Sequence, residues 1–300
     1  MTSAPDAPVW RSLLYVPANV AKFVDRAHER GADAVILDLE DSVQPADKDA
    51  ARAGLGAAMA KVSRAGADTI VRINRPIGMA VRDIEEAVRP GLKGLFITKT
   101  EGADHLRILD EHVSELEQRR GMPVGHVRFV GMIEHPRVVE RVHETARATP
   151  RLAALTLGGE DFALEMGMVP AEEALELPKR LVSFAAIGAG LQMFGILGTV
   201  ADYANKEANH RSAERARRFG FTGATCVHPG LVDILNAAFT PGAEEVAYAH
   251  KLIAADQTAA AEGRGSFTVD GKMIDIPVID RARRLIVRHE AVQRRLAGRA

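Results

Sequence analysis

The chain has 300 residues, of which 47% are hydrophobic and 26% are charged, and its formal net charge is −1 at pH 7. These fractions are typical of a globular protein, and the near-zero charge predicts neither a nucleic-acid partner nor attraction to an anionic membrane. The single cysteine, Cys226, excludes an internal disulfide and a thiolate metal cluster. No apolar run is long enough to span a bilayer and no secretory leader is visible, so a cytoplasmic enzyme is expected.

Short apolar runs alternate with segments of helical periodicity, and eight such strand–helix units follow one another. The expected strands are residues 12–17, 34–41, 68–74, 94–101, 127–133, 152–157, 191–197 and 224–227. The expected helices are residues 19–31, 45–64, 81–89, 103–120, 136–148, 178–189 and 201–219, with a short helix from residue 231. Strands with few alternating polar residues are typical of a parallel sheet covered on both faces. The pattern predicts an α/β fold, a (β/α)8 TIM barrel, with a doubly wound sheet as the alternative.

Two parts of unequal size are expected along the chain. Residues 1–240 would form the TIM-barrel catalytic domain. Residues 241–300 would form a C-terminal helical lid and oligomerisation segment, with a helix over 241–261, a glycine-rich loop over 262–277 and a basic helix from Ile279. A glycine-rich loop between two helices has the composition of a movable lid.

Polar side chains gather at the expected strand ends, which is where a TIM barrel builds its active site. They are Asp38, Glu40, Asp41, Arg72, Lys99, Glu134 and Asp161. A lone carboxylate after a strand more often caps a helix or forms a surface ion pair than binds a metal. However, two neighbouring strands that each end in a carboxylate can hold a hard divalent cation. Glu134 and Asp161 are therefore the candidate ligands of a magnesium ion.

Seven motifs taken together resemble the HpcH/HpaI aldolase and citrate lyase superfamily, and most closely its citrate lyase beta subunit-like and malyl-CoA lyase branch. They occupy residues 12–17, 38–43, 71–74, 133–134, 158–161, 228–229 and 270–277, in the order of the family. The resemblance covers nearly the whole chain. It implies a Mg2+-dependent barrel enzyme that cleaves or forms a carbon–carbon bond in a short 3-hydroxyacyl-CoA, such as malyl-CoA or citramalyl-CoA.

The resemblance also implies roles for individual residues. Glu134 and Asp161 match the metal ligands, and Arg72 matches the arginine that contacts the acyl carbonyl and the substrate carboxylate. Asp275 matches a lid aspartate that reaches the active site of a neighbouring subunit. A fixed cation such as Arg72 suits the negative oxygen of an acyl-CoA enolate, and a carboxyl such as Asp275 suits proton transfer to its carbon.

Coenzyme A recognition is implied for Tyr15, Lys22 and Arg26, which fall where the family holds this group. A small-molecule acyl-CoA or keto-acid substrate and a homotrimer or homohexamer follow from the same resemblance. The chain departs from the family at His135-Pro136, at Gly230-Leu231 and at Phe194-Gly195. These departures bear on substrate choice more than on metal binding.

Several alternatives remain open from the residues. Lys99 could form a Schiff base, but a lysine among acids stays protonated, and an ion pair with Glu101 or Glu134 is expected instead. Cys226 and His228 could form a thiol nucleophile, although a cysteine in an apolar strand is more often inert core. On the same site, the alternatives to a lyase are malate synthase-like condensation, malyl-CoA thioesterase activity and a CoA-independent pyruvate aldolase. A non-catalytic scaffold is disfavoured because the candidate ligands and Arg72 are all present.

Overall fold

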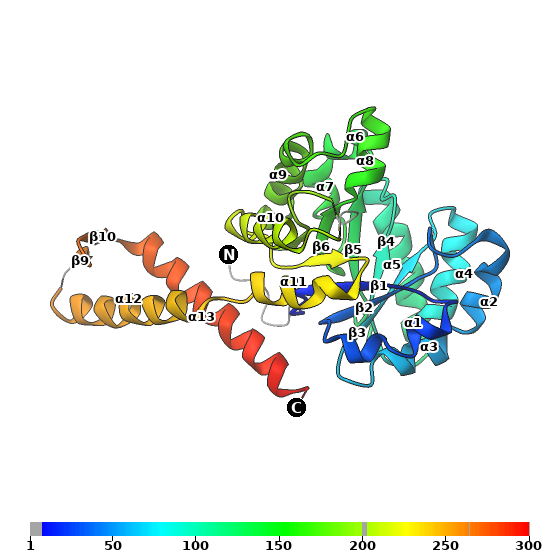
Figure 1. Ribbon diagram of the computed structural model, residues 1–300, viewed down its shortest axis with the longest axis horizontal. Coiled ribbons are helices and arrows are strands. Elements are labelled where there is room, and N and C mark those ends of the chain that lie inside the picture. Colours follow the sequence, from blue (N-terminus) through cyan, green and yellow to red (C-terminus); the bar gives the residue numbers. More distant parts are fainter. Residues whose placement is uncertain (1–7, 200–202, 264, 300) are drawn as a thin grey trace. The chain divides into compact units, whose positions relative to one another are not determined.

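The computed structural model describes residues 8–199, 203–263 and 265–299 (Figure 1). These residues fall into two compact units, one running to Phe239 and the other beginning at Thr240. Of the helices within the described ranges, none is long and apolar enough to cross a membrane.

The first unit is built on eight parallel strands, of which β1 to β6 are labelled in Figure 1. Their order is β7-β6-β5-β4-β3-β2-β1-β8, and a parallel bridge between Phe194 and Gly223 joins the two ends of this series. The predicted TIM-barrel fold is thus confirmed as a nearly closed barrel. The strands are β1 (Ser12–Pro17), β2 (Ala34–Asp38), β3 (Asp68–Ile73), β4 (Leu92–Ile97), β5 (Arg128–Ile133), β6 (Leu152–Leu157), β7 (Gln192–Phe194) and β8 (Ala224–Cys226).

Helices follow the strands and pack on the outside of the barrel, as α3 does on β2 and α9 on β6 and β7. Three expected single helices are interrupted. Residues 19–31 contain a four-residue α-helix and a separate 3-10 turn, Gly54 separates α2 from α3, and residues 136–148 contain two four-residue helices. The α-helices of this unit are α1 (Ala21–Val24), α2 (Lys48–Ala53), α3 (Leu55–Val62), α4 (Ile77–Ala87), α5 (Ala103–Arg119), α6 (Pro136–Val139), α7 (Val142–Thr145), α8 (Gly159–Met166), α9 (Glu172–Gly188), α10 (Lys206–Arg218) and α11 (Val232–Ala238). The 3-10 turns are η1 (Ala27–Arg30), η2 (Pro45–Asp47) and η3 (Pro229–Leu231).

Alternation along the strands divides the buried side chains into two cores. The smaller core fills the barrel interior and takes residues from seven of the strands: Leu13, Ala34, Ile36, Ile70, Phe96, Val130, Ala154 and Phe194, closed by Trp10. The larger core lies between the strands and the surrounding helices. Because the interior is packed with side chains, the space available for a ligand lies at the ends of the strands.

The second unit consists of α12 (Ala243–Ala261), the hairpin strands β9 (Phe267–Val269) and β10 (Lys272–Ile274), and α13 (Ile276–Ala297). Its own small core includes Leu252, Val269 and Ile279. The segment expected to be a loop therefore contains a hairpin, turned by Asp270 and Gly271 with φ of 50° and 74°. Two consecutive positive φ angles are typical of a type I′ hairpin turn, for which Asp-Gly is a favoured pair.

Candidate metal and acyl-CoA site

Three cavities open at the carboxyl ends of the barrel strands and share lining residues. A cavity of about 400 Å³ is lined by Tyr15, Arg72 and Asp161, among others. A cavity of about 230 Å³ is lined by Glu134 and Asp161, and Lys99 lines both this one and a third of about 500 Å³. Asp161 thus connects the first two cavities, and the structure brings together Tyr15, Arg72, Glu134 and Asp161 at one rim.

Arg72, at the end of β3, is held in place by the acids that follow β2. Its Nε and one terminal nitrogen each donate to a different oxygen of Asp38 at 2.6 Å, and the other terminal nitrogen lies 3.1 Å from Glu40. A bidentate pair of this kind fixes the plane of the guanidinium. Burial raises the pKa of the Asp38 carboxyl, but hydrogen bonds from Arg72 and Ser42 outweigh burial and leave that pKa below its ordinary value. Arg72 is therefore a fixed, permanently charged group on the wall of the 400 Å³ cavity.

Tyr15 packs beneath Arg72, with the guanidinium carbon 4.8 Å from the centre of the phenol ring. Burial raises the pKa of the phenol above its ordinary value, so the side chain stays neutral. Its hydroxyl is buried, and within the described part of the chain no group forms a hydrogen bond with it. An orphaned buried hydroxyl in a cavity wall is a place where a ligand can supply the missing partner.

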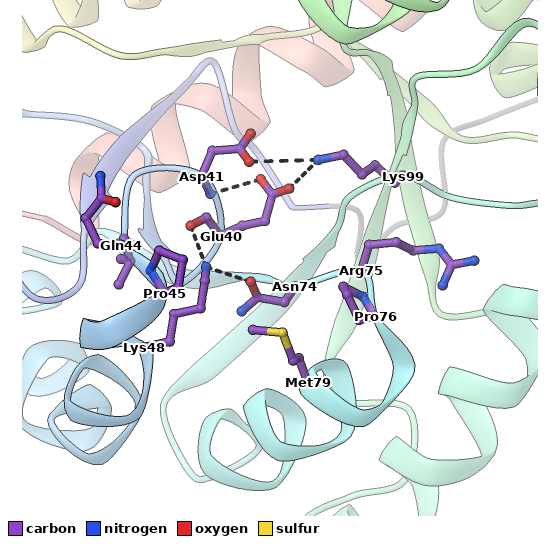
Figure 2. A pocket seen from close by; sticks show the side chains of 11 residues that line it. Glu40, Asp41, Gln44, Pro45, Lys48, Asn74, Arg75, Pro76, Met79 and Lys99 are labelled. Carbon is purple, nitrogen blue, oxygen red and sulfur yellow. Dashed lines mark hydrogen bonds and ion pairs between the residues drawn. The ribbon is translucent and has the colours of Figure 1, made fainter.

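Lys99 follows β4 and crosses the rim to the acids after β2, as Figure 2 shows. Its ammonium lies 2.5 Å from Glu40, 3.9 Å from Asp41 and 4.0 Å from Asp161. The expected ion pair with Glu101 or Glu134 is wrong: Glu101 pairs with two arginines, and Glu134 accepts from the backbone N–H of Lys99.

The charge state of Lys99 also bears on the Schiff-base alternative. Burial lowers the pKa of the ammonium, but the hydrogen bond and charge of Glu40 outweigh burial and leave the pKa above its ordinary value. A protonated lysine is a poor nucleophile, so the geometry disfavours a Schiff base.

The candidate metal ligands are Glu134, which directly follows β5, and Asp161, in the first turn of α8. Glu134 is only 4% exposed, and burial, reinforced by the charge of Asp161, raises the pKa of its carboxyl to about 8. Gly158 makes room for this side chain, because a Cβ at position 158 would lie 2.6 Å from the Glu134 Cγ.

The residues at this rim fit a magnesium ion. Within the described ranges, no three histidine, cysteine or carboxylate side chains cluster closely enough to enclose a metal. Magnesium needs no such cage, because it keeps several waters and is commonly held by one or two carboxylates together with its substrate. A buried carboxylate that is forced toward its neutral form is stabilised in its charged form by a nearby cation. Glu134 and Asp161 would hold the metal.

The remaining predicted residues lie outside these cavities or in the second unit. Lys22 and Arg26 are exposed on and just after α1, and Arg26 forms a surface ion pair with Glu29 at 3.0 Å. Asp275 precedes α13 and its side chain makes no capping hydrogen bond. The roles implied for these three residues stay predictions.

The residues that depart from the family pattern have local structural partners. His135 accepts a hydrogen bond from the backbone N–H of Arg137 at 3.2 Å, and its other ring nitrogen lies 3.3 Å from Glu165. His228 similarly accepts from the N–H of Gly230 at 3.0 Å. Both histidines cap the turn that follows their strand.

Cys226 is completely buried in β8, and burial raises the pKa of its thiol to about 12. A thiol in this state is not a nucleophile at neutral pH, which confirms the expectation of inert core.

One buried charge at the site went unrecognised in the sequence. Lys179 on α9 is 4% exposed and lines the 400 Å³ cavity. A signal was present, because Lys179 falls on the buried helical face between Leu175 and Val182. A lysine on such a face must find acceptors inside the protein.

Comparison with known proteins agrees with this geometry. A profile of the HpcH/HpaI aldolase/citrate lyase family matches residues 11–229. Citrate lyase subunit beta of Escherichia coli K12 is 34% identical over 284 residues, which are 93% of this chain and 93% of that protein. L-malyl-CoA/beta-methylmalyl-CoA lyase of Cereibacter sphaeroides is 31% identical, covering 96% of this chain and 97% of that one.

A solved structure is also similar along almost its whole length. It is the crystal structure of the protein CitE from Mycobacterium tuberculosis in complex with magnesium, acetoacetate and coenzyme A. It is 26% identical to this chain, with a TM-score of 0.72, and the match covers 96% of this chain and 100% of that one. The predicted family is confirmed: the chain belongs to the HpcH/HpaI aldolase/citrate lyase family.

Proposed function

We propose that this protein is a Mg2+-dependent carbon–carbon lyase that cleaves a short 3-hydroxyacyl-CoA, such as malyl-CoA or citramalyl-CoA, into an acyl-CoA and a keto acid. The single observation that supports this most is the position of Asp161. It shares one cavity with Glu134 and another with Arg72, so the candidate metal ligands and a fixed cation border one space. Relatives named citrate lyase subunit beta and L-malyl-CoA/beta-methylmalyl-CoA lyase support the same reaction class.

The chemistry divides among the residues at the rim. Magnesium bound by Glu134 and Asp161 would supply Lewis-acid polarisation of the oxygen that becomes the keto group. Arg72 offers a preorganised positive charge to the thioester oxygen, where negative charge develops as the carbon–carbon bond breaks. Because Asp38 already fixes the guanidinium, little reorganisation is needed during the reaction. Tyr15 lines the same cavity, and its hydroxyl has no hydrogen-bond partner among the described residues.

The remaining steps fall to residues away from this rim. Lys22 and Arg26, which are exposed cations, would bind the phosphates of coenzyme A. Asp275 would deliver the proton to the acyl-CoA carbon, from the second unit of a neighbouring subunit in a homotrimer or homohexamer. A carboxyl at that position can act as acid in cleavage and as base in condensation.

A substrate panel tests the proposal. The purified protein is incubated with malyl-, citramalyl- and methylmalyl-CoA, with and without Mg2+, while keto acid and free CoA are followed separately. Keto acid without free CoA is the expected result. Free CoA would favour thioester hydrolysis, and cleavage that persists after complete metal removal would contradict the proposal.

Sharing of the site between subunits has its own test. Arg72→Met and Asp275→Asn proteins, each inactive alone, are mixed under conditions that exchange subunits. If one chain supplies Arg72 and another supplies Asp275, the hybrids contain some intact sites and recover activity. A mixture whose subunits have exchanged but which stays inactive would place both residues in the same chain.

A further inference from the structure

Lys179 is buried within α9, yet its ammonium has a full set of acceptors. Its Nζ donates to the backbone carbonyl oxygen of Ile196 at 2.8 Å, to that of Leu197 at 2.9 Å, and to that of Gly198. An ammonium has three N–H groups, so the charged form is matched to three successive carbonyls. These carbonyls belong to the loop that follows β7.

Ser212 on α10 binds the backbone N–H groups of the same loop. Its hydroxyl oxygen accepts from the backbone N–H groups of Leu197 and Gly198, each at 3.0 Å. The hydroxyl in turn donates to Glu172 at 3.1 Å, at the start of α9. The carbonyl groups of this short loop are therefore bound by α9 and its amide groups by α10. Because the loop is neither strand nor helix, these side chains supply the hydrogen bonds that secondary structure would otherwise provide.

The loop held in this way forms part of the wall of the 400 Å³ cavity. Ile196, Gly198 and Thr199 line it together with Arg72 and Asp161. A loop in a cavity wall with unsatisfied backbone groups would open to water, since each buried unpaired group costs free energy. A shift of this wall would change the space in which substrate meets Arg72.

We propose that Lys179 is a positioning residue, which with Ser212 fixes the loop at residues 196–198 as a wall of the substrate cavity. Only the expected effect on KM and kcat rests on the proposed function. The acyl-CoA is held less well when the loop is released, so KM rises more than kcat falls.

The surroundings of Lys179 suggest a pH dependence of this contact. Burial lowers the pKa of the ammonium to about 7, against the opposing charges of Glu172 on α9 and Glu160 on α8. Glu172 is itself paired with Arg215 on α10. A neutral amine has two N–H groups, so loss of the proton leaves one of the three carbonyls without a donor.

Lys179→Met and Lys179→Arg are compared with Lys61→Met, a surface control whose lysine pairs with Asp25. Hydrogen exchange of the Leu197 and Gly198 amides is measured together with KM and kcat from pH 6 to 9. For Lys179→Met we expect weaker protection of both amides, measured relative to their intrinsic exchange rates at each pH, and a KM about tenfold higher at pH 7, the effect of losing one or two hydrogen bonds. Because this variant has no amine that could lose a proton, its protection factors should not change around pH 7. Lys179→Arg, charged throughout, should restore slow exchange at high pH, and Lys61→Met should match the wild type.

Folded Lys179→Met with wild-type protection of both amides and a wild-type KM at pH 7 would overturn the proposal. If Lys179→Met does not fold, Ser212→Ala gives the second test, because it keeps the lysine and frees the same two amides. Unchanged exchange in Ser212→Ala would also overturn the proposal. The exchange measurement needs no turnover, so a wild-type protein that cleaves none of the acyl-CoA panel would refute the proposed function and leave this test intact.

Discussion

Gly158→Ala should disable the metal site by adding a single methyl group. Gly158 has φ −77° and ψ 94°, angles that alanine adopts without strain, so the substitution acts through space rather than through the backbone. The added Cβ would lie 2.6 Å from Cγ of Glu134 and 3.1 Å from both its Cδ and Oε1. Such atoms prefer separations of about 3.5 to 4.0 Å, so the carboxylate must move by roughly 1 Å.

A displacement of this size has a larger effect on function than on folding. Overpacking a buried site by one methyl group typically costs about 1–3 kcal/mol of stability. A misplacement of about 1 Å in a catalytic constellation can cost on the order of 100-fold in rate. We therefore expect Gly158→Ala to fold, to bind Mg2+ more weakly and to lose about 100-fold in kcat/KM toward its acyl-CoA substrate.

Titration calorimetry with Mg2+ and steady-state kinetics measure the two effects, and urea unfolding measures the stability. Gly188→Ala is the matched control, because a Cβ at that position at the end of α9 meets nothing within 4 Å. It should leave Mg2+ affinity and turnover unchanged. Wild-type Mg2+ affinity in folded Gly158→Ala would refute the argument that Glu134 is a ligand whose position this glycine permits.

Three further predictions follow from the charges at the site. Asp38→Ala leaves the Arg72 guanidinium without its bidentate partner, and urea unfolding should show a loss of about 3–5 kcal/mol. Glu29→Ala breaks an exposed ion pair and should leave the free energy of unfolding close to that of the wild type. Because the metal-free pKa of Glu134 is about 8, Mg2+ binding at pH 7 should release about one proton, and the Mg2+ affinity should rise with pH until that pKa is passed. Calorimetry in buffers of different ionisation enthalpy measures the number of protons released and the affinity. A proton count near zero would argue against ligation by this carboxyl. Asp275→Asn should abolish proton transfer but keep the wild-type Kd for Mg2+; wild-type turnover in this variant would remove Asp275 from the mechanism.

The fold was predictable because its signals are local and repeated. Each strand is a short apolar run, such as residues 152–157, and each is followed by a helix, so the eightfold alternation is visible without knowledge of any contact. Parallel strands place their carboxyl ends at one rim, and this rule alone brings Arg72, Glu134 and Asp161 into one region. That Gly158 leaves room for the side chain of Glu134 could be seen only in the structure.

The partners at the rim were not predictable from the chain. Lys99 has several acids near it in sequence and in the fold, and its selection of Glu40 depends on how far the side chain reaches across neighbouring strands. The acceptors of Lys179 lie on a loop 17 to 19 residues away, and nothing in that loop's composition marks its carbonyls. The type I′ hairpin at Asp270-Gly271 was missed because the flanking strands are only three residues long.

The charge balance of the rim explains why a cation belongs there. Arg72 pairs with Asp38, and Lys99 pairs with Glu40. The positive charge near the other two carboxylates is the Lys99 ammonium, which lies 4.0 Å from Asp161 but already pairs with Glu40. In the absence of a metal, the protein meets this excess by favouring a proton on Glu134, which is the meaning of its raised pKa. A divalent cation held by Glu134 and Asp161 would compete with that proton and would favour the charged form of both carboxylates. Burial therefore makes Glu134 a weak acid, and it also means that a divalent cation would stabilise the Glu134 carboxylate more than the singly charged Arg72 and Lys99 do.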